Sequence, residues 1–263
     1  MSEIISPGIH SEKVSRWKKL SAKAELTDGI CRMMAEGEHM AGEALACGKA
    51  QCLIVSENAC EKYAYLIEKA RLAGITVYHV SERVYAYLCD TKTPQGISAE
   101  CEIRTVLKPG EAKKSVILER VQDPGNVGTV LRTADAAGFD LLVCDRETAN
   151  PFSPKALRAS MGAVFRVPVM ICDHVCPVIR EIKETGADVL AGDLRGSDLF
   201  SADYNAGQVC ILVGNEGSGI SAEAAEEATK RVRIPMPGRA ESLNAGVAAS
   251  ILMYDVIRRN RTE

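Results

Sequence analysis

Towards its C-terminal end the chain reads Ile234-Pro-Met-Pro-Gly-Arg-Ala-Glu-Ser-Leu-Asn-Ala-Gly-Val-Ala-Ala-Ser-Ile251. Residues 232–235 have the pattern of a strand end, a Pro-Gly pair then interrupts regular structure, and small and apolar residues recur at helical spacing from Ser242 to Arg259. Ser242 or Asn244 can cap this helix, because either side chain can accept hydrogen bonds from N–H groups of the first turn. The segment predicts strand, loop and helix, with backbone donors aimed at a ligand; alone, it also fits an ordinary strand-to-helix connection.

Two earlier segments repeat this plan. The first leads from an apolar strand at residues 116–121, through a Pro-Gly-Asn loop, into a helix whose first residues are small. The second, Ile211 to Ser221, contains three glycines, which adopt backbone conformations that other residues rarely reach. Three such loops in one α/β half are expected to converge on one ligand.

The three segments resemble the three signature motifs of the SpoU branch of the SPOUT methyltransferases, the TrmH-type enzymes that 2′-O-methylate RNA. The first motif is matched by Asn126 to Arg132 and the second by Gly214 to Gly219. The third is matched by Ile234 to Met236 together with Ser242 to Asn244. The resemblance implies an S-adenosyl-L-methionine-dependent RNA methyltransferase that acts as a homodimer. It also implies a deep trefoil knot at the C-terminal end of the fold.

The rest of the chain alternates strand-like and helix-like patterns, which predicts an α/β fold with two domains. Residues 1–106 are expected to form an N-terminal RNA substrate-binding domain, residues 107–115 a polar linker, and residues 116–263 a SpoU-type SPOUT methyltransferase domain. Strands separated by helices predict a mostly parallel sheet in the last of these. The N-terminal region resembles an L30e-like domain at residues 36–38 and 90–96, although Glu36-Gly37 also fits a plain turn.

The pattern predicts the elements one by one. The expected strands are residues 51–55, 75–79, 116–121, 141–144, 165–170, 188–191, 209–213 and 232–235. The expected helices are residues 41–47, 59–73, 84–89, 127–137, 153–160, 178–185 and 223–229, followed by the C-terminal helix. A strand is less clearly indicated at residues 31–35, because two methionines stand where relatives have a β-type apolar run.

The composition is that of a folded protein with 263 residues, 46 % of them hydrophobic, and a formal net charge of −3. Charge alone does not draw such a chain onto nucleic acid, so any RNA contact is expected to be local. The first residues lack the apolar core of a secretory signal, and no later run approaches the length of a membrane-spanning helix. We therefore expect a soluble, cytoplasmic protein.

The ten cysteines are expected to be reduced, and no two of them form a Cys-x-x-Cys pair. Cys172-Asp-His-Val-Cys176 is the one cluster with metal-ligand chemistry. Structural zinc takes four ligands and no second pair accompanies this one, so no metal site is predicted.

The resemblance assigns roles to five candidate catalytic residues. Arg132 takes the place of the proposed catalytic arginine, but arginine stays protonated in proteins, so we expect a phosphate clamp and a member of the proton path and leave the base open. Asn126 is expected to hydrogen-bond the ribose or orient Arg132, and Glu216 to partner both; the alternatives are a turn asparagine and a solvated loop carboxylate. Ser242 and Asn244 are expected to hold the active-site loop and the substrate while capping the last helix.

The resemblance also implies how the methyl donor is held. Apolar side chains would sandwich its flat base while backbone amides read the edge of that base. No GxGxxG precedes a helix, so the ordinary dinucleotide fingerprint is absent. The residues expected to bind S-adenosyl-L-methionine are Gly214, Asn215, Gly217, Ile234, Met236, Leu243 and Asn244.

Two basic groups are candidates for RNA binding. Lys18 and Lys19 belong to a basic, helix-like leader around Trp17, the only tryptophan in the chain. Lys155 and Arg158 stand three residues apart on one helical face, a spacing suited to phosphate contacts. Both groups also fit ordinary solvated helix faces.

The leading hypothesis is thus a ribose 2′-O-methyltransferase acting on RNA. Because a substantial N-terminal domain is present, 23S ribosomal RNA is favoured over transfer RNA as the substrate, by analogy only. A non-catalytic RNA-binding or ribosome-assembly factor that keeps the fold is a second hypothesis, against which the five intact catalytic positions speak. A generic α/β nucleotide-binding enzyme is a third.

Overall fold

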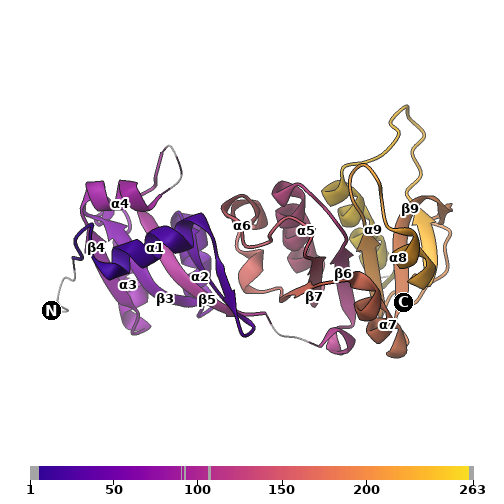
Figure 1. Ribbon diagram of the computed structural model, residues 1–263, viewed down its shortest axis with the longest axis horizontal. Coiled ribbons are helices and arrows are strands. Elements are labelled where there is room, and N and C mark those ends of the chain that lie inside the picture. The colour runs from indigo at the N-terminus through magenta and orange to yellow at the C-terminus, as the bar shows by residue number, and fades with distance from the viewer. Residues whose placement is uncertain (1–5, 90, 92, 106–107, 261–263) are drawn as a thin grey trace. The chain divides into compact units, whose positions relative to one another are not determined.

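The computed structural model describes residues 6–89, 91, 93–105 and 108–260. By its contacts the chain divides into two compact units (Figure 1). The first consists of Met1–Arg104 with Phe152–Phe165, and the second of Thr105–Pro151 with Arg166–Glu263. The boundaries 1–106, 107–115 and 116–263 stay predictions. Residues 106 and 107 lie outside the described part, as do residues 90 and 92 of the segment that resembles an L30e-like domain.

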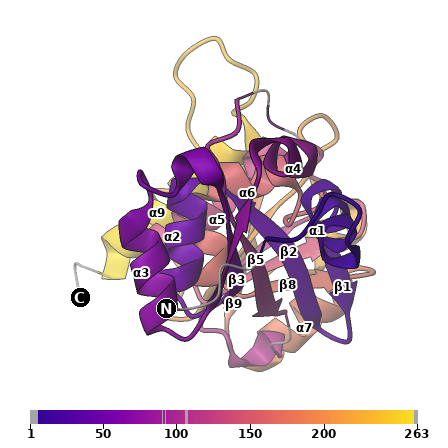
Figure 2. The same ribbon diagram turned by 90° about the vertical axis from the view of Figure 1, so that its left-hand side faces the viewer.

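The first unit is built on a five-stranded mixed sheet in the order β1-β2-β5-β3-β4, in which β3 and β4 are parallel and the other neighbours antiparallel. Helices α1 and α4 cover one face and α2 and α3 the other (Figure 2). Its elements are α1 Glu12–Ala22, β1 Glu25–Thr27, β2 Ile30–Glu36, α2 Glu38–Ala46, β3 Ala50–Ser56, η1 Glu57–Ala59, α3 Ala64–Leu72, β4 Thr76–Val80, α4 Glu82–Leu88, β5 Ile97–Arg104, α6 Pro154–Ser160 and η3 Ala163–Phe165.

The central strand β5 was missed by the sequence patterns. Its run of small and polar residues includes Glu100, a carboxylate that would be costly to bury alone. In the structure Glu100 is buried but paired, because it accepts a hydrogen bond of 2.9 Å from Trp17 Nε1 and forms an ion pair with Arg16. The segment 31–35 is also part of a strand, β2, in which Met33 and Met34 are buried.

The second unit is built on a six-stranded sheet in the order β11-β9-β10-β6-β7-β8, and every neighbouring pair is parallel. The predicted α/β class with a mostly parallel sheet is confirmed. Its elements are η2 Pro109–Glu111, β6 Lys114–Leu118, α5 Pro124–Ala136, β7 Leu141–Asp145, β8 Val169–Cys172, α7 Val175–Glu184, β9 Asp188–Asp198, β10 Val209–Val213, α8 Ala222–Glu227, β11 Lys230–Arg233 and α9 Ala245–Asn260.

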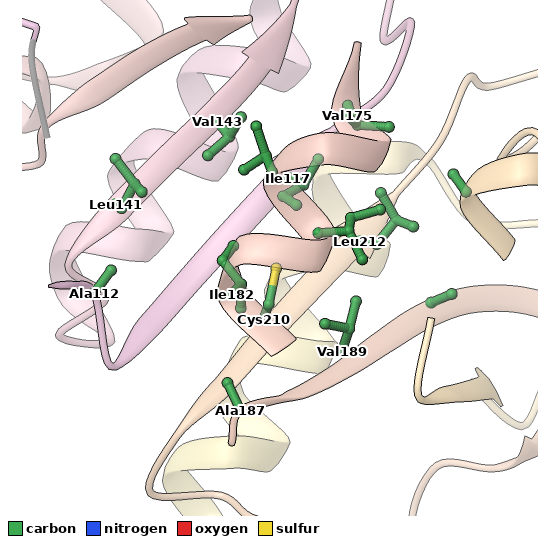
Figure 3. Close-up of a cluster of buried hydrophobic side chains, with 14 residues drawn as sticks. Ala112, Ile117, Leu141, Val143, Val175, Ile182, Ala187, Val189, Cys210 and Leu212 are labelled. Carbon is green, nitrogen blue, oxygen red and sulfur yellow. The ribbon is translucent and has the colours of Figure 1, made fainter. Parts of the chain in front are cut away.

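Helix α7 anchors one face of this sheet. Val175, Ile179 and Ile182 lie over the inward-facing residues of the strands, which include Cys210 and Leu212 (Figure 3). Burying each large aliphatic side chain contributes about 1.5–3 kcal/mol relative to exposure. The strong helical periodicity of α7 thus fixes it to the sheet and leaves the opposite face to α5 and α9.

Helices α5 and α9 pack closely against each other on that opposite face. A Cβ atom added to Gly246 would lie 3.3 Å from Thr129 Cβ, and Thr133 Oγ1 lies 2.9 Å from Ser250 Oγ. Small residues let two helix backbones approach, so α9 is held against the helix of the first motif. The threading of the trefoil knot stays a prediction. Among the described residues, no helix is long and apolar enough to cross a membrane.

Candidate active site

Residues 234–244 have no regular secondary structure and form a long loop between β11 and α9 (Figure 1). Asn244 ends the loop, where its Oδ1 accepts hydrogen bonds from the N–H groups of Gly246 at 2.9 Å and Val247 at 3.2 Å. Of the two expected helix caps, Asn244 therefore takes the role, because it directly precedes the first turn. Ser242 stands two residues earlier, in the loop itself.

The loop of the second motif is folded by its own asparagine. Asn215 Oδ1 accepts hydrogen bonds from the N–H groups of Gly217 at 2.9 Å and Ser218 at 3.0 Å. Asn215 Nδ2 donates to the carbonyl oxygen of Arg120 at 2.8 Å, which ties this loop to the end of β6. Asn215 therefore holds two loops together, and its predicted role in cofactor binding stays a prediction.

The first motif differs locally from its prediction. A Pro-Gly-Asn loop was expected before a helix starting at residue 127, but α5 already begins at Pro124. Asp123 caps it by accepting from the N–H of Gly125 at 2.9 Å, and proline suits the first helical position because its fixed φ matches the helix. Asn126 consequently lies in the first turn and is buried rather than exposed in a turn.

Glu216 joins the first and second motifs. Its Oε1 accepts a hydrogen bond of 2.8 Å from Asn126 Nδ2, and its Oε2 accepts one of 3.1 Å from the N–H of Gln122. Partial burial acts to raise the pKa of Glu216, but these hydrogen bonds and one from the N–H of Asp123 outweigh it, so the pKa lies below its usual value. Glu216 is therefore ionised at neutral pH, which makes it an organiser of the site and a weak general base.

A pocket of about 640 Å³ lies where the loops of the second and third motifs meet. Two of the predicted catalytic residues, Glu216 and Ser242, line this pocket. Six of the seven residues predicted to bind the cofactor line this pocket: Gly214, Asn215, Gly217, Ile234, Met236 and Leu243.

Three of the five predicted catalytic residues are not part of the pocket lining. Asn126 is hydrogen-bonded to Glu216, which does line the pocket, and Asn244 caps the start of α9. Arg132 is exposed on α5, six residues after Asn126, whereas residues on one helix face are three or four apart. Arg132 thus lies outside the pocket lining of its own chain, and its catalytic role stays a prediction.

The structure adds pocket residues that the sequence patterns missed. Asp193 and Arg195 line the pocket from β9, in a part of the chain where the predicted strand ended at residue 191. Glycines at positions 192 and 196 frame these residues. This Gly-x-x-x-Gly spacing after an apolar strand was the signal available in the sequence.

Comparison with known proteins identifies the family. The SpoU rRNA Methylase family matches residues 113–254, which is more than half of the chain. The chain belongs to the SpoU rRNA methylase family. An MRM3-like substrate binding domain matches residues 11–99, within the first unit.

Individual SpoU relatives are similar over most of the chain. The 23S rRNA (guanosine(2553)-2'-O)-methyltransferase RlmP of Bacillus subtilis is 36 % identical over 93 % of this chain and 95 % of its own length. The 23S rRNA (guanosine-2'-O-)-methyltransferase RlmB of Xanthomonas campestris is 31 % identical over 73 % of this chain and 81 % of its own. The AdoMet-bound rRNA methyltransferase from Sinorhizobium meliloti superposes with a TM-score of 0.80 and 31 % identity, covering 97 % of this chain and 98 % of that one.

The basic residues predicted to bind RNA lie on two helices of the first unit of this SpoU protein. Lys18 and Lys19 are on α1, where the Lys18 ammonium stands 5.5 Å from the centre of the Tyr87 ring. Lys155 and Arg158 are both exposed on α6. An RNA-binding role for the four residues stays a prediction.

The cysteines of this SpoU protein are all free thiols. In the described parts of the chain, no three His, Cys, Asp or Glu side chains are grouped so that they could hold a metal ion. Burial raises the pKa of Cys172 to about 11, so this thiol of the Cys172–Cys176 cluster stays protonated at neutral pH.

Proposed function

We propose that this protein transfers a methyl group from S-adenosyl-L-methionine to a ribose 2′-hydroxyl of 23S ribosomal RNA. The observation that carries the proposal is the pocket formed by the second and third motifs, which is lined by six residues predicted for the cofactor. Its volume of about 640 Å³ is in the range of pockets that enclose cofactor-sized ligands. The names of RlmP and RlmB support the chemistry and the substrate, since both relatives are 23S rRNA 2'-O-methyltransferases.

The pocket residues fit such a methyl donor. Ile234, Met236 and Leu243 offer apolar side chains for a flat base, and the folded loop from Gly214 to Gly219 brings backbone groups to the same cavity. When bound, the cofactor supplies a methyl group on a good leaving group. The protein then has to hold the attacking oxygen in line and remove its proton.

The chain's own residues divide this work. Glu216 is ionised and accepts a hydrogen bond from Asn126, so each of these two side chains holds the other in one orientation. We assign Ser242, in the pocket lining, to the substrate side of the loop and Asn244 to positioning the helix start. Arg132 is assigned to an RNA phosphate next to the reacting hydroxyl, where its permanent positive charge also favours loss of the proton. The general base stays open.

A homodimer completes the site in this proposal. Ala245, Ala248 and Leu252 of α9 line the pocket, while Val247 and Tyr254 on another face of the helix are 45 % and 53 % exposed. Large exposed apolar side chains next to a site favour a protein partner. A second copy packed on this face would place its own Arg132, which is exposed on the adjoining helix α5, near the pocket.

Gly214→Ala tests the pocket. An added Cβ would lie 2.3 Å from the carbonyl carbon of Gly219 and from the N of Ile220, and this backbone cannot move aside without opening the loop. Overpacking of this kind costs about 1–3 kcal/mol, so we expect cofactor affinity to fall by roughly 10- to 100-fold in isothermal titration. Gly207→Ala is the matched control, because Gly207 is not part of the pocket lining and its Cβ would meet only Asn205 Oδ1 at 3.4 Å. Equal losses in both variants would contradict the assigned pocket.

The reaction itself is tested by transfer of labelled methyl groups from S-adenosyl-L-methionine to unmodified 23S ribosomal RNA. Transfer RNA serves as the second substrate, and digestion identifies the modified nucleoside. We expect a 2′-O-methylnucleoside from the ribosomal RNA. A product from transfer RNA alone would change the substrate, and cofactor binding without transfer to either RNA or to ribosomal particles would favour a non-catalytic assembly factor. We also propose a cytoplasmic location, because the relatives that are named as 23S rRNA methyltransferases are bacterial proteins.

A further inference from the structure

Strand β9 contains a break that opens onto the pocket. It pairs with β11 at Leu190 and Ala191, and the pairing resumes only at Ser197, opposite the next residue of β11. Residues 192–196 therefore have no ladder partner on β11, and we call them the β9 bulge. Bulges of this kind re-aim side chains and are frequent beside active sites.

Two glycines hold the β9 bulge in place. A Cβ atom on Gly196 would lie 2.5 Å from the carbonyl carbon of Arg231 and from the N of Val232, so the bulge backbone rests directly on that of β11. A Cβ on Gly192 would lie 3.3 Å from Leu252 of α9. Only glycine permits the approach at position 196, so the end of the bulge lies directly against the backbone of β11.

Asp193 holds the guanidinium of Arg195. Its Oδ1 accepts from the N–H of Arg195 at 2.9 Å and faces Arg195 Nε at 3.3 Å, while Oδ2 lies 3.3 Å from Arg195 Nη2. The Asp193 side chain is 7 % exposed and that of Arg195 is 81 % exposed. Burial acts to raise the pKa of Asp193, but the hydrogen bonds and charge of Arg195, with a smaller contribution from Arg231, lower it overall, so the carboxylate is ionised.

This arrangement leaves one edge of Arg195 available. The Nε and Nη2 edge faces Asp193, so the Nη1 hydrogens and the second Nη2 hydrogen remain for another acceptor. Arg233, on β11, is exposed and lines the same pocket. A guanidinium edge held in advance is suited to bidentate binding of a phosphate, because little side-chain freedom is left to lose.

We propose that the β9 bulge is a phosphate-binding element for the RNA substrate, in which Arg195, positioned by Asp193, grips the sugar-phosphate backbone at the pocket rim together with Arg233. The proposal rests on the proposed function, since a ribose that enters the pocket carries phosphates on both sides. The high exposure of Arg195 favours a macromolecule over the enclosed cofactor. The contact reads the backbone and carries no sequence information.

The test uses the full chain and a fluorescein-labelled single-stranded RNA of mixed sequence. Binding is measured by anisotropy without cofactor between about 50 and 200 mM salt, since each phosphate contact adds about 0.7 to the slope of log K against log salt. Arg195→Gln is expected to reduce this slope by about 0.7. Arg180→Gln is the matched control, because Arg180 is exposed in the same unit and its Nε and Nη2 meet Glu227 at 2.7 and 2.6 Å, away from the pocket. Equal slopes for the two variants overturn the proposal.

Two further readouts separate this role from others. Asp193→Asn removes a negative charge, so charge alone predicts tighter RNA binding. Loss of positioning predicts RNA binding that is weaker by several-fold, and tighter binding overturns the role of Asp193.

Titration of Arg195→Gln with S-adenosyl-L-methionine is expected to give the same affinity as the wild type. A tenfold loss of cofactor affinity with an unchanged salt slope overturns the proposal, because Arg195 would then bind the cofactor carboxylate. Methyl transfer by the wild-type protein tests the proposed function separately, because the salt slopes do not depend on it.

Discussion

Replacing Arg132 by alanine is expected to lower kcat for methyl transfer by about 10²- to 10³-fold, the usual effect of removing a group that stabilises developing charge. Affinity for S-adenosyl-L-methionine should stay within about twofold, because Arg132 is exposed on α5 and is not part of the pocket lining. The measurement is single-turnover methyl transfer to RNA, with cofactor affinity from titration of the same preparation. Parallel loss of both quantities would show that Arg132 is structural.

A mixing experiment distinguishes a residue that acts in its own chain from one that acts across a dimer. Arg132→Ala chains have an intact pocket, and Gly214→Ala chains have an intact Arg132. If the partner supplies Arg132, heterodimers of the two variants contain one complete site, and the mixture should recover about a quarter of wild-type activity after random subunit exchange. Absence of recovery, with exchange verified by mass spectrometry, would contradict the shared site.

Sequence patterns found the loops of the site because each loop carries residues with few structural alternatives. Residues 209–213 of β10 were predicted to the residue, since a continuous apolar run before a Gly-rich loop is typical of a buried parallel strand. The start of α5 was misplaced, because Pro-Gly was taken as a turn signal. Because Asp123 precedes the pair as a helix cap, Pro124 instead occupies the first helical position.

Other features were beyond the patterns for a different physical reason. The place of Glu100 in a central strand depends on Trp17 and Arg16, more than eighty residues away in sequence. The β9 bulge likewise depends on the backbone of β11 beneath Gly196. Hydrophobic periodicity is a local property of the sequence, so it cannot predict the burial of polar groups whose hydrogen-bond partners are distant in the chain.

Asp255→Ala is expected to destabilise the second unit by about 3 kcal/mol, because it removes one carboxylate from several partners. Asp255 is buried within α9 and forms ion pairs with Arg258 at 2.7 Å and Arg259 at 2.8 Å. Its Oδ2 also accepts a hydrogen bond of 2.7 Å from Tyr204, and Arg259 in turn donates to the carbonyl oxygen of Leu199 at 2.9 Å. The network therefore fixes the end of α9 to the segment that follows β9.

Chemical denaturation followed by circular dichroism measures the change in free energy of unfolding. Trp17, the only tryptophan, lies in the first unit, so its fluorescence reports whether that unit is affected. Tyr204→Phe is the comparison variant, since it removes only the hydroxyl and is expected to cost about 1.5 kcal/mol. A loss for Asp255→Ala no larger than that would show that the two arginines contribute nothing.

The contribution of the Asp255 carboxylate to the free energy of unfolding depends on pH, and the direction of this dependence can be predicted. Burial acts to raise the pKa of Asp255, but the hydrogen bonds from Tyr204, Arg259 and Arg258 lower it overall below its usual value. A carboxylate whose pKa is lower in the folded than in the unfolded state adds stability above the unfolded pKa and loses it as the pH falls through the folded pKa. The gap in unfolding free energy between wild type and Asp255→Asn should therefore be constant near neutral pH and narrow in acid. A gap that widened in acid would mean that the folded protein holds Asp255 protonated, and the ion pairs with both arginines would then be wrong.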